Sequence, residues 1–150
     1  MAITASGAYG LTLEKMFIDT AGQSLEAETH KGLLVTDSEA PNFDTHNFRD
    51  DILAECSGTG YTAGGATITT TEITVGSPAA GSLKWDFDDP AWSGSTIASA
   101  MAHISYFNVG SAATDQLILL LDFVTAVSTT AGLLTVAIHA NGALNLDYTP

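Results

Sequence analysis

The stretch that decides the fold runs from residue 96 to residue 124, TIASAMAHISYFNVGSAATDQLILLLDFV. The run LILLL at 117–121 is apolar at every position, and residues 97–107 place small or apolar groups on both faces of an expected strand. Strands of this kind lie at the centre of a sheet, covered on both sides. The stretch therefore predicts two central strands, at 96–107 and 116–124, and the main part of the hydrophobic core.

Further strands are expected on both sides of this stretch. The runs bounded by turn-forming residues are 32–36, 66–75, 82–89, 133–140 and 143–148. Several short strands with few helical patterns are typical of an antiparallel sandwich. The sequence therefore predicts an all-β fold, an antiparallel β-sandwich of jelly-roll-like or immunoglobulin-like topology with one or two short helices. Residues 1–30 are expected to form an N-terminal arm with a short helix, and residues 31–150 the β-sandwich domain.

Alternating residues predict the buried faces of two of these strands. The apolar residues expected to face inward are Leu83, Trp85, Phe87, Leu144, Leu146 and Tyr148. The pair Asn141-Gly142 lies between two expected strands and is typical of a type I′ hairpin, in which both central residues need a positive φ. We therefore expect the strands at 133–140 and 143–148 to pair with each other.

Two short helices are expected outside the strands. Leu13, Met16 and Phe17 recur at helical spacing within residues 11–18. Their apolar stripe must dock either on its own domain, the favoured alternative, or on a neighbouring subunit, so these three residues are the candidate partner interface. A second helix is expected over 46–52, with Asp44 or Thr45 as its N-cap.

The N-terminal residues 1–10, MAITASGAYG, are small. We expect them to be loose enough to lie along a neighbouring subunit. Their removal is expected to leave the fold intact and to weaken binding to that neighbour.

The charge of the chain excludes one class of partner. Of 150 residues, 17 are acidic and four are basic, which gives a formal net charge of −13. Such a surface repels a phosphate backbone, so no direct nucleic-acid binding is expected. No stretch approaches the ~20 apolar residues of a membrane span, and the start lacks the features of a secretory signal. We expect a protein made in the cytoplasm, without membrane contact.

No pattern of catalytic or metal-binding residues stands out. The four histidines are scattered singly, at positions 30, 46, 103 and 139, and none forms an HExxH motif. Cys56 has no histidine close in sequence to act as a base, so it reads as a small buried residue. The acidic run Asp86, Asp88 and Asp89 is followed at once by a proline, which favours a solvated strand end over a calcium loop. We expect no catalytic residue, metal or cofactor, and no enzyme activity.

Six sequence runs resemble a group of small tailed-bacteriophage virion proteins encoded among the structural genes. The runs are AYGLTLEKMF, LLVTDSEAPNFDTHNFRDDI with SGTGYTAGG, DDPAWSGSTIASA, and LILLLDF with STTAGLLTVAIHANGALNL. Together they cover most of the chain, and they are loop and strand signatures rather than active-site signatures. The resemblance implies a β-rich component of the virion, commonly a head decoration or cement protein, without enzymatic activity.

The first expectation for function is therefore a capsid decoration protein on the outer surface of the virion. Its partner would be the major capsid protein, and the chain would form a homo-oligomer, with a trimer favoured by the apolar strand surface expected over 97–124. The alternative is a tail, head-fibre or spike component that adsorbs to a host-surface glycan, with exposed aromatic residues such as Trp92 or Tyr61. A small hydrolase using Asp86, Asp88 and His103 is a third, disfavoured reading.

Overall fold

The computed structural model describes residues 3–18 and 22–149 of the chain. Its elements, in chain order, are β1 (Gly7–Ala8), α1 (Gly10–Phe17), β2 (His30–Thr36), the 3₁₀ helix η1 (Arg49–Asp51), β3 (Gly58–Thr59), β4 (Ala66–Ile68), β5 (Glu72–Val75), β6 (Ser82–Asp86), β7 (Ala91–Ile97), β8 (Ala100–Phe107), β9 (Leu117–Val127), β10 (Gly132–Thr135) and β11 (Leu144–Asp147). All paired strands are antiparallel. The prediction of an all-β, antiparallel sandwich-like fold is confirmed.

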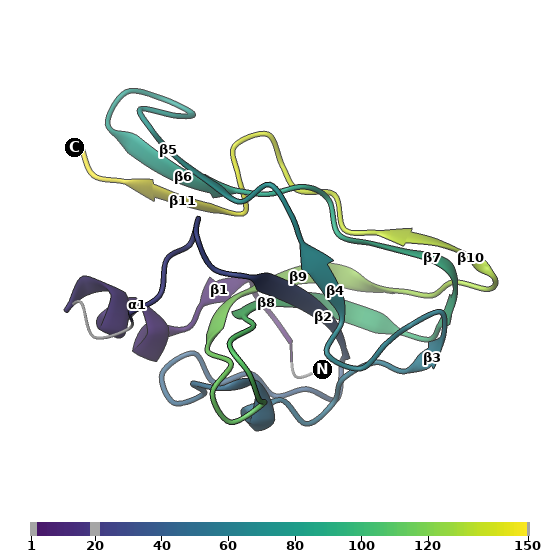
Figure 1. Ribbon diagram of the computed structural model, residues 1–150. Coiled ribbons are helices and arrows are strands. Elements are labelled where there is room, and N and C mark those ends of the chain that lie inside the picture. Colours follow the sequence, from purple (N-terminus) through teal and green to yellow (C-terminus); the bar gives the residue numbers. More distant parts are fainter. Residues whose placement is uncertain (1–2, 19–21, 150) are drawn as a thin grey trace.

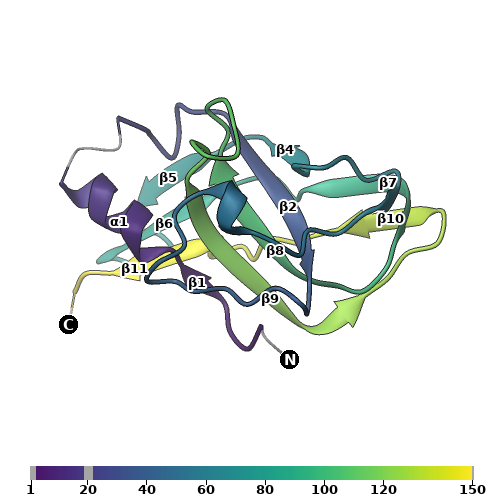
Figure 2. The same cartoon turned by 90° about the horizontal axis from the view of Figure 1, so that it is seen from below.

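The strands form two layers (Figure 1). One layer is a five-stranded sheet in the order β1-β9-β8-β2-β4. The other consists of two three-stranded sheets, β10-β7-β3 and β11-β6-β5, which lie end to end. The view from below shows β8 and β9 running the length of the molecule, with α1 at the end where the C-terminus lies (Figure 2).

The middle of the five-stranded sheet, formed by β8, most of β2 and the first half of β9, is buried on both faces, as the opening stretch of sequence predicts. On its inner face, two core clusters join it to the second layer, one around Trp85 and Phe107 and one around Leu34 and Trp92. On its outer face, a third cluster is covered by the segment between β2 and β3, drawn in blue below the sheet in Figure 1. All of β8 is buried, which explains why its sequence is apolar or small at almost every position.

The interruption of the second layer explains the acidic run after β6. Asp88 accepts hydrogen bonds from the Thr69 and Thr70 hydroxyls, and Asp89 Oδ1 accepts one from the Ile138 N–H at 2.8 Å. The carbonyl of Pro90 accepts a hydrogen bond from the Val136 N–H. Where the strand ladder is broken, the Asp89 carboxylate thus binds the main chain and the Asp88 carboxylate binds threonine hydroxyls.

Two of the expected strands are each divided in the structure. The expected strand at 96–107 is β7 and β8, separated at Ser99, which has a φ of 54°. The expected strand at 66–75 is β4 and β5, separated near Thr70, which has a φ of 55°, and the two halves belong to different layers. A positive φ in serine or threonine has no sequence signature, since these residues rarely adopt it.

The predicted pairing of the last two strands is wrong. β10 pairs with β7, and β11 pairs with β6, so the two strands lie in different sheets. Gly142 alone has a positive φ, whereas a type I′ turn would require one at Asn141 as well. The turn is instead closed by a hydrogen bond from the Gly142 N–H to the His139 carbonyl, 2.7 Å long.

The predicted inward faces are confirmed in part. Trp85 and Phe87 are buried, whereas Leu83 and Leu144 are half-buried. Leu146 and Tyr148 are exposed, with 48% and 54% of their surface accessible, so their predicted burial is wrong. The register explains the difference. Leu146 lies beside Leu83 near the end of the sheet, two rungs beyond the pair of Leu144 with Trp85, where the covering core ends.

The helix predictions had different outcomes. The helix expected over 11–18 is α1, whereas the helix expected over 46–52 is reduced to the single turn η1. Neither Asp44 nor Thr45 is an N-cap there. The Asn42 side chain accepts hydrogen bonds from the N–H groups of both residues and closes a separate turn. No helix within the described residues is long and apolar enough to span a bilayer.

The described part of the N-terminal segment is not loose. Gly7 and Ala8 pair with β9, while Ile3 and Tyr9 are completely buried in the outer cluster. Ile3 and residues 7–9 thus contact the chain's own domain, residues 4–6 are exposed, and residues 1–2 lie outside the described residues. Of the expected arm at 1–30, residues 19–21 also lie outside the described residues.

Candidate functional site

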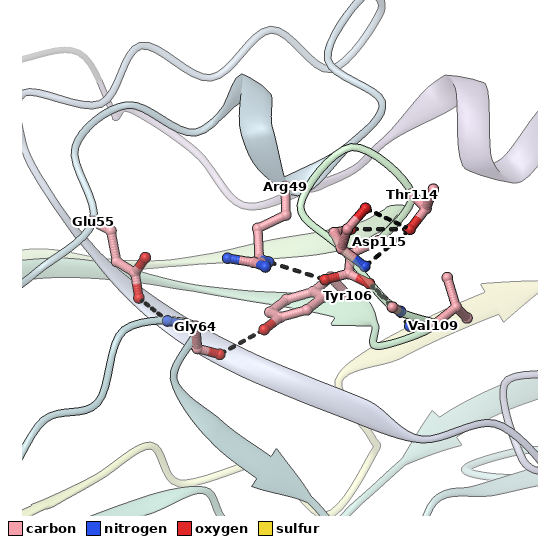
Figure 3. Close-up of polar contacts among 9 residues, drawn as sticks. Arg49, Glu55, Gly64, Tyr106, Val109, Thr114 and Asp115 are labelled. Atoms are coloured by element: carbon pink, nitrogen blue, oxygen red, sulfur yellow. Dashed lines mark hydrogen bonds and ion pairs between the residues drawn. The ribbon is translucent and has the colours of Figure 1, made fainter.

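A network of polar side chains covers the outer face of the five-stranded sheet (Figure 3). It joins η1 to the loop at 108–115 before β9 and to the glycine loop, residues 60–65 between β3 and β4. The buried carboxylate of Asp115 accepts a hydrogen bond from Arg49 Nε at 3.1 Å, and others from the N–H groups of Val109 and Gly110 at 2.9 and 3.1 Å. One carboxylate thus fixes η1 and the loop at 108–115 together.

The glycine loop is held by the same network. Glu55 Oε1 accepts hydrogen bonds from the Gly64 N–H at 2.6 Å and from the Tyr61 hydroxyl at 2.8 Å. The Tyr106 hydroxyl donates to the Gly64 carbonyl at 2.6 Å. Gly64 has a φ of 85°, which favours glycine at this position. The loop is thereby fixed to β8, consistent with a structural glycine loop.

Charge and burial in this network fit a scaffold. Burial raises the pKa of the Tyr106 hydroxyl to about 12, although the nearby Arg49 guanidinium opposes the change. The Arg49 guanidinium carbon lies 5.4 Å from the centre of the Tyr106 ring. Main-chain N–H groups of Asn47 and Phe48 donate to Asp51 and lower the pKa of its carboxyl group. The acidic and basic groups of this face thus bind one another and the main chain.

A second polar group lies between the layers. His30 and His103 are completely buried, and neither ring nitrogen of either residue has a hydrogen-bond partner. They lie on adjacent strands, separated by the rung that pairs Gly32 with Ser105, whose hydroxyl is also unpartnered. Burial lowers the pKa of both histidines to about 4. At neutral pH this pair is therefore uncharged.

The other candidate residues for chemistry lie apart. Cys56 is buried in the cluster around Trp92, and burial followed by the charge of Glu55 raises its thiol pKa to about 11. Asp86 binds Lys84 at 2.8 Å, whereas Asp88 binds threonine hydroxyls. In the part of the chain that the structure describes, no three His, Cys, Asp or Glu side chains are grouped to hold a metal ion.

The candidate interface residues on α1 have different surroundings. Met16 is half-buried and packs against the cluster around Trp85, while Leu13 is half-buried. The residue of this helix that is completely buried is Thr12, whose hydroxyl donates to the Leu117 carbonyl. Phe17 is 79% exposed. The stripe therefore faces its own domain at Met16 and solvent at Phe17.

The aromatic residues expected at a glycan groove are not exposed. Trp92 is buried, and the Tyr61 ring stacks on it with 6.0 Å between ring centres. The Tyr61 hydroxyl donates to Glu55 and accepts a hydrogen bond from the Leu34 N–H at 3.0 Å. The two residues named for sugar stacking are therefore part of the core and its cover.

Of the ten large apolar side chains that are exposed among the described residues, eight belong to segments at the two opposite ends of the sandwich, and Leu53 and Val109 lie elsewhere. At the end that carries α1, β5 and β11 are Phe17, Ile18, Val75, Leu146 and Tyr148, here called the helix end. At the end where β9 stops and β10 begins are Val124, Val127 and Leu133, here called the turn end. Single exposed apolar residues are ordinary, whereas groups of them mark contact surfaces.

Sequence reasoning identified one of these eight residues, Phe17, as a contact residue. Val75 and Leu146 both pair with Leu83, and this apolar rung predicts burial. The structure shows that the core cluster around Trp85 does not reach this rung. Exposure at the turn end depends on a bulge in β9 that opposes residues 122–127 to Ala100–Ala102 of β8. These are tertiary properties with no local signal.

Comparisons with known proteins identified no match: no family model, no curated protein and no solved structure is similar to this chain.

Proposed function

We propose that this chain is a structural protein of a tailed-bacteriophage virion, a decoration protein on the outer capsid surface that stabilises contacts between capsomers. The observation that carries the proposal is the placement of exposed apolar residues at two opposite ends of one sandwich. A molecule with one contact surface can coat a particle. A molecule with two can bridge neighbouring subunits.

The sequence resemblance to small virion proteins supports the same function. The net charge of −13 opposes unspecific aggregation and suits an outer surface, because it opposes contact with packaged DNA. Avidity at many equivalent positions makes weak contacts collectively strong, so each end needs only a small apolar surface. The major capsid protein is the proposed partner.

A homotrimer is part of the proposal, with the helix end as its contact surface. The strand surface at 97–124, which first suggested self-association, is covered mainly by the chain's own layers. The helix end remains exposed, and a three-fold axis on a capsid would match a trimer. Light scattering at micromolar concentration should give three times the chain mass, whereas a monomeric mass would contradict a trimer.

The test compares the two ends on the particle. Phe17→Ser and Leu133→Ser each remove one exposed apolar side chain, and Leu53→Ser removes one that is 89% exposed but lies at neither end. Purified heads that lack the chain are mixed with each variant, and bound protein is measured after sedimentation. Both end variants should lower occupancy about tenfold, while Leu53→Ser binds as the native chain does.

Equal occupancy of the heads by all three variants would contradict the role of the two ends in binding. Failure of the native chain to bind heads, together with binding to tails, would replace the proposal with a tail or spike component in adsorption. Circular dichroism of each variant confirms that a loss of binding is not a loss of fold.

A further inference from the structure

A hollow at the turn end is apolar and uncharged. It lies between the second half of β9 and β10 and has a volume of about 380 Å³. The residues that line it are Phe123, Val127 and 133–137. Of the described lining residues only Thr135 has a polar side chain, and none carries a charge. Leu133 is 65% exposed and Val136 is buried, so the hollow has an apolar base that solvent can reach. It therefore suits an apolar side chain rather than a polar group.

The sequence around this hollow is also free of charge. Residues 90–114 and 123–146 contain no aspartate, glutamate, lysine or arginine, although the net charge of the chain is −13. The sheet β10-β7-β3 consists of parts of these two segments and of Gly58–Thr59, so none of its strands carries a charged residue. An acidic protein, including another copy of this chain, can therefore approach the turn end without repulsion between like charges.

The helix end presents an apolar group that is not covered by its own domain. Phe17 is the last residue of α1, and Ile18 follows it. The two side chains are 79% and 60% exposed. Figure 1 shows α1 at the extremity of the molecule opposite β10, beside the two layers rather than between them. Aromatic side chains that leave solvent for an apolar pocket are typical of the residues that dominate the affinity of an interface.

Acidic side chains accompany this apolar group. Glu14 on α1, Glu72 on β5 and Asp147 on β11 are all exposed. Lys15 is only half-exposed, and its Nζ donates to Asn47 Oδ1 at 3.2 Å. Two helix ends brought together would place these acidic groups opposite one another, which weakens binding. The helix end therefore fits the uncharged turn end better than it fits another helix end.

Three-fold symmetry leads to the same pairing. In a ring, each contact joins one surface of a copy to a different surface of the next copy, whereas a surface that contacts itself gives a two-fold dimer. A trimer with three helix ends at its axis would gather their acidic side chains there. The two ends lie at opposite extremities (Figure 1), so three molecules can instead meet end to end as the sides of a triangle. Each helix end then contacts a turn end.

We propose that Phe17 and Ile18 of one copy insert into the turn-end hollow of the next copy, and that three such contacts close a head-to-tail trimer. The partner of the turn end is thus a second copy of this chain. The closed ring of three rests on the proposed function, whereas the match in charge and shape between the two ends does not.

The test mixes two variants of the full chain, each with one surface blocked. Phe17→Glu and Leu133→Glu place a charge at exposed residues of the two surfaces, and the control Leu53→Glu places the same charge at a residue that is 89% exposed and lies at neither end. Light scattering from micromolar to millimolar concentration gives the masses. The native chain and Leu53→Glu should be trimers, and each end variant alone should need at least about tenfold more protein to assemble.

The equimolar mixture of the two end variants identifies a head-to-tail contact. Phe17 of the Leu133→Glu chain can still enter the intact hollow of the Phe17→Glu chain, so the mixture should form a dimer and nothing larger. This dimer has one contact where each copy in the ring has two, so it should require at least about tenfold more protein than the native trimer. A mixture that stays monomeric would overturn the proposal.

A second pair of variants tests the hollow without a change of charge. Ala137→Trp fills the hollow and should weaken assembly as Leu133→Glu does, while Ala113→Trp, at an exposed residue of the loop at 108–115, should assemble as the native chain does. Circular dichroism confirms that each variant is folded. Native assembly by Ala137→Trp would overturn the proposal.

The native chain gives three further outcomes that would overturn the proposal. These are a monomer up to millimolar concentration, a dimer that Leu133→Glu disrupts and Phe17→Glu does not, and a mass that grows without limit. Binding to purified heads is measured separately. A chain that assembles as predicted but does not bind heads would retain this inference and lose the proposed function. A monomer that binds heads would lose this inference and retain the decoration role.

Discussion

The two faces of the five-stranded sheet differ in whether their buried polar groups are hydrogen-bonded. On the outer face, the buried carboxylate of Asp115 has three hydrogen-bond donors around it. On the inner face, His30, His103 and Ser105 have no partner for their side-chain nitrogen and oxygen atoms. A paired buried group stabilises a structure only while every partner remains, whereas an unpaired one lowers its stability from the start. We therefore expect different changes to destabilise the packing on the two faces.

The largest effect is expected on the outer face. Asp115→Ala leaves the N–H groups of Val109 and Gly110 without an acceptor and Arg49 without its partner, so the free energy of unfolding should fall by about 4 kcal/mol. Urea denaturation of the native chain and the variant measures it. Asp50→Ala, which removes an exposed carboxylate beside Arg49, should change stability by less than about 0.5 kcal/mol. Equal effects of the two substitutions would show that the network does not stabilise the fold.

The next effect tests how closely the inner face is packed. A Cβ atom at Gly32 would lie 1.9 Å from His103 Nε2, and the ring has no free space in the core. Gly32→Ala should therefore cost about 3 kcal/mol of stability, measured by urea denaturation. In the double variant Gly32→Ala with His103→Ala, the cost of the first change should be smaller by at least about 1.5 kcal/mol. Additive effects would mean that the ring does not occupy this space.

Acid should weaken the inner face specifically. The pKa of about 4 for His103 lies below the unfolded value of about 6.5, so the unfolded chain binds the proton more readily. Above pH 6.5, protonation of His103 does not affect the free energy of unfolding. As the pH drops toward 4, protonation of the unfolded chain lowers this free energy, by about 2 kcal/mol at pH 5. His30 should behave in the same way. Denaturation midpoints between pH 7 and pH 4 measure the loss.

The smallest effect sharpens the same comparison. His103→Leu replaces an unpaired imidazole by an apolar side chain, so stability at pH 7 should change by less than about 1 kcal/mol, and the dependence on pH below 6.5 should become shallower. His139→Leu at the exposed residue serves as the control. If His103→Leu keeps the full loss of stability in acid, other groups cause it.

How much of this could be predicted from the sequence depends on the scale of the feature. The central strands β8 and β9 follow from residues that are apolar at nearly every position, and α1 follows from the spacing of Leu13, Met16 and Phe17. The sequence does not predict the partners of β10 and β11. Asn141-Gly142 favours pairing of these two strands with each other, whereas in the structure β10 pairs with β7 and β11 pairs with β6. Pairing between distant strands is decided by the whole core.

The candidate surfaces were harder to predict than the core. Phe17 and Trp92 look alike in the sequence as large aromatic residues near short elements, yet one is exposed and the other buried. The difference arises because Trp92 faces the cluster between the layers, whereas Phe17 lies at the last position of α1. Exposure at an edge or an end is a property of the assembled layers, and no local pattern encodes it.

The measurement that tests the proposed function most directly is a cryo-EM reconstruction of the virion of which this chain is proposed to be a component. The account predicts density for the chain at regular positions over the whole head, with the helix end and the turn end contacting different neighbours. Density restricted to the tail or to one vertex, or absence of the chain from the particle, would contradict it.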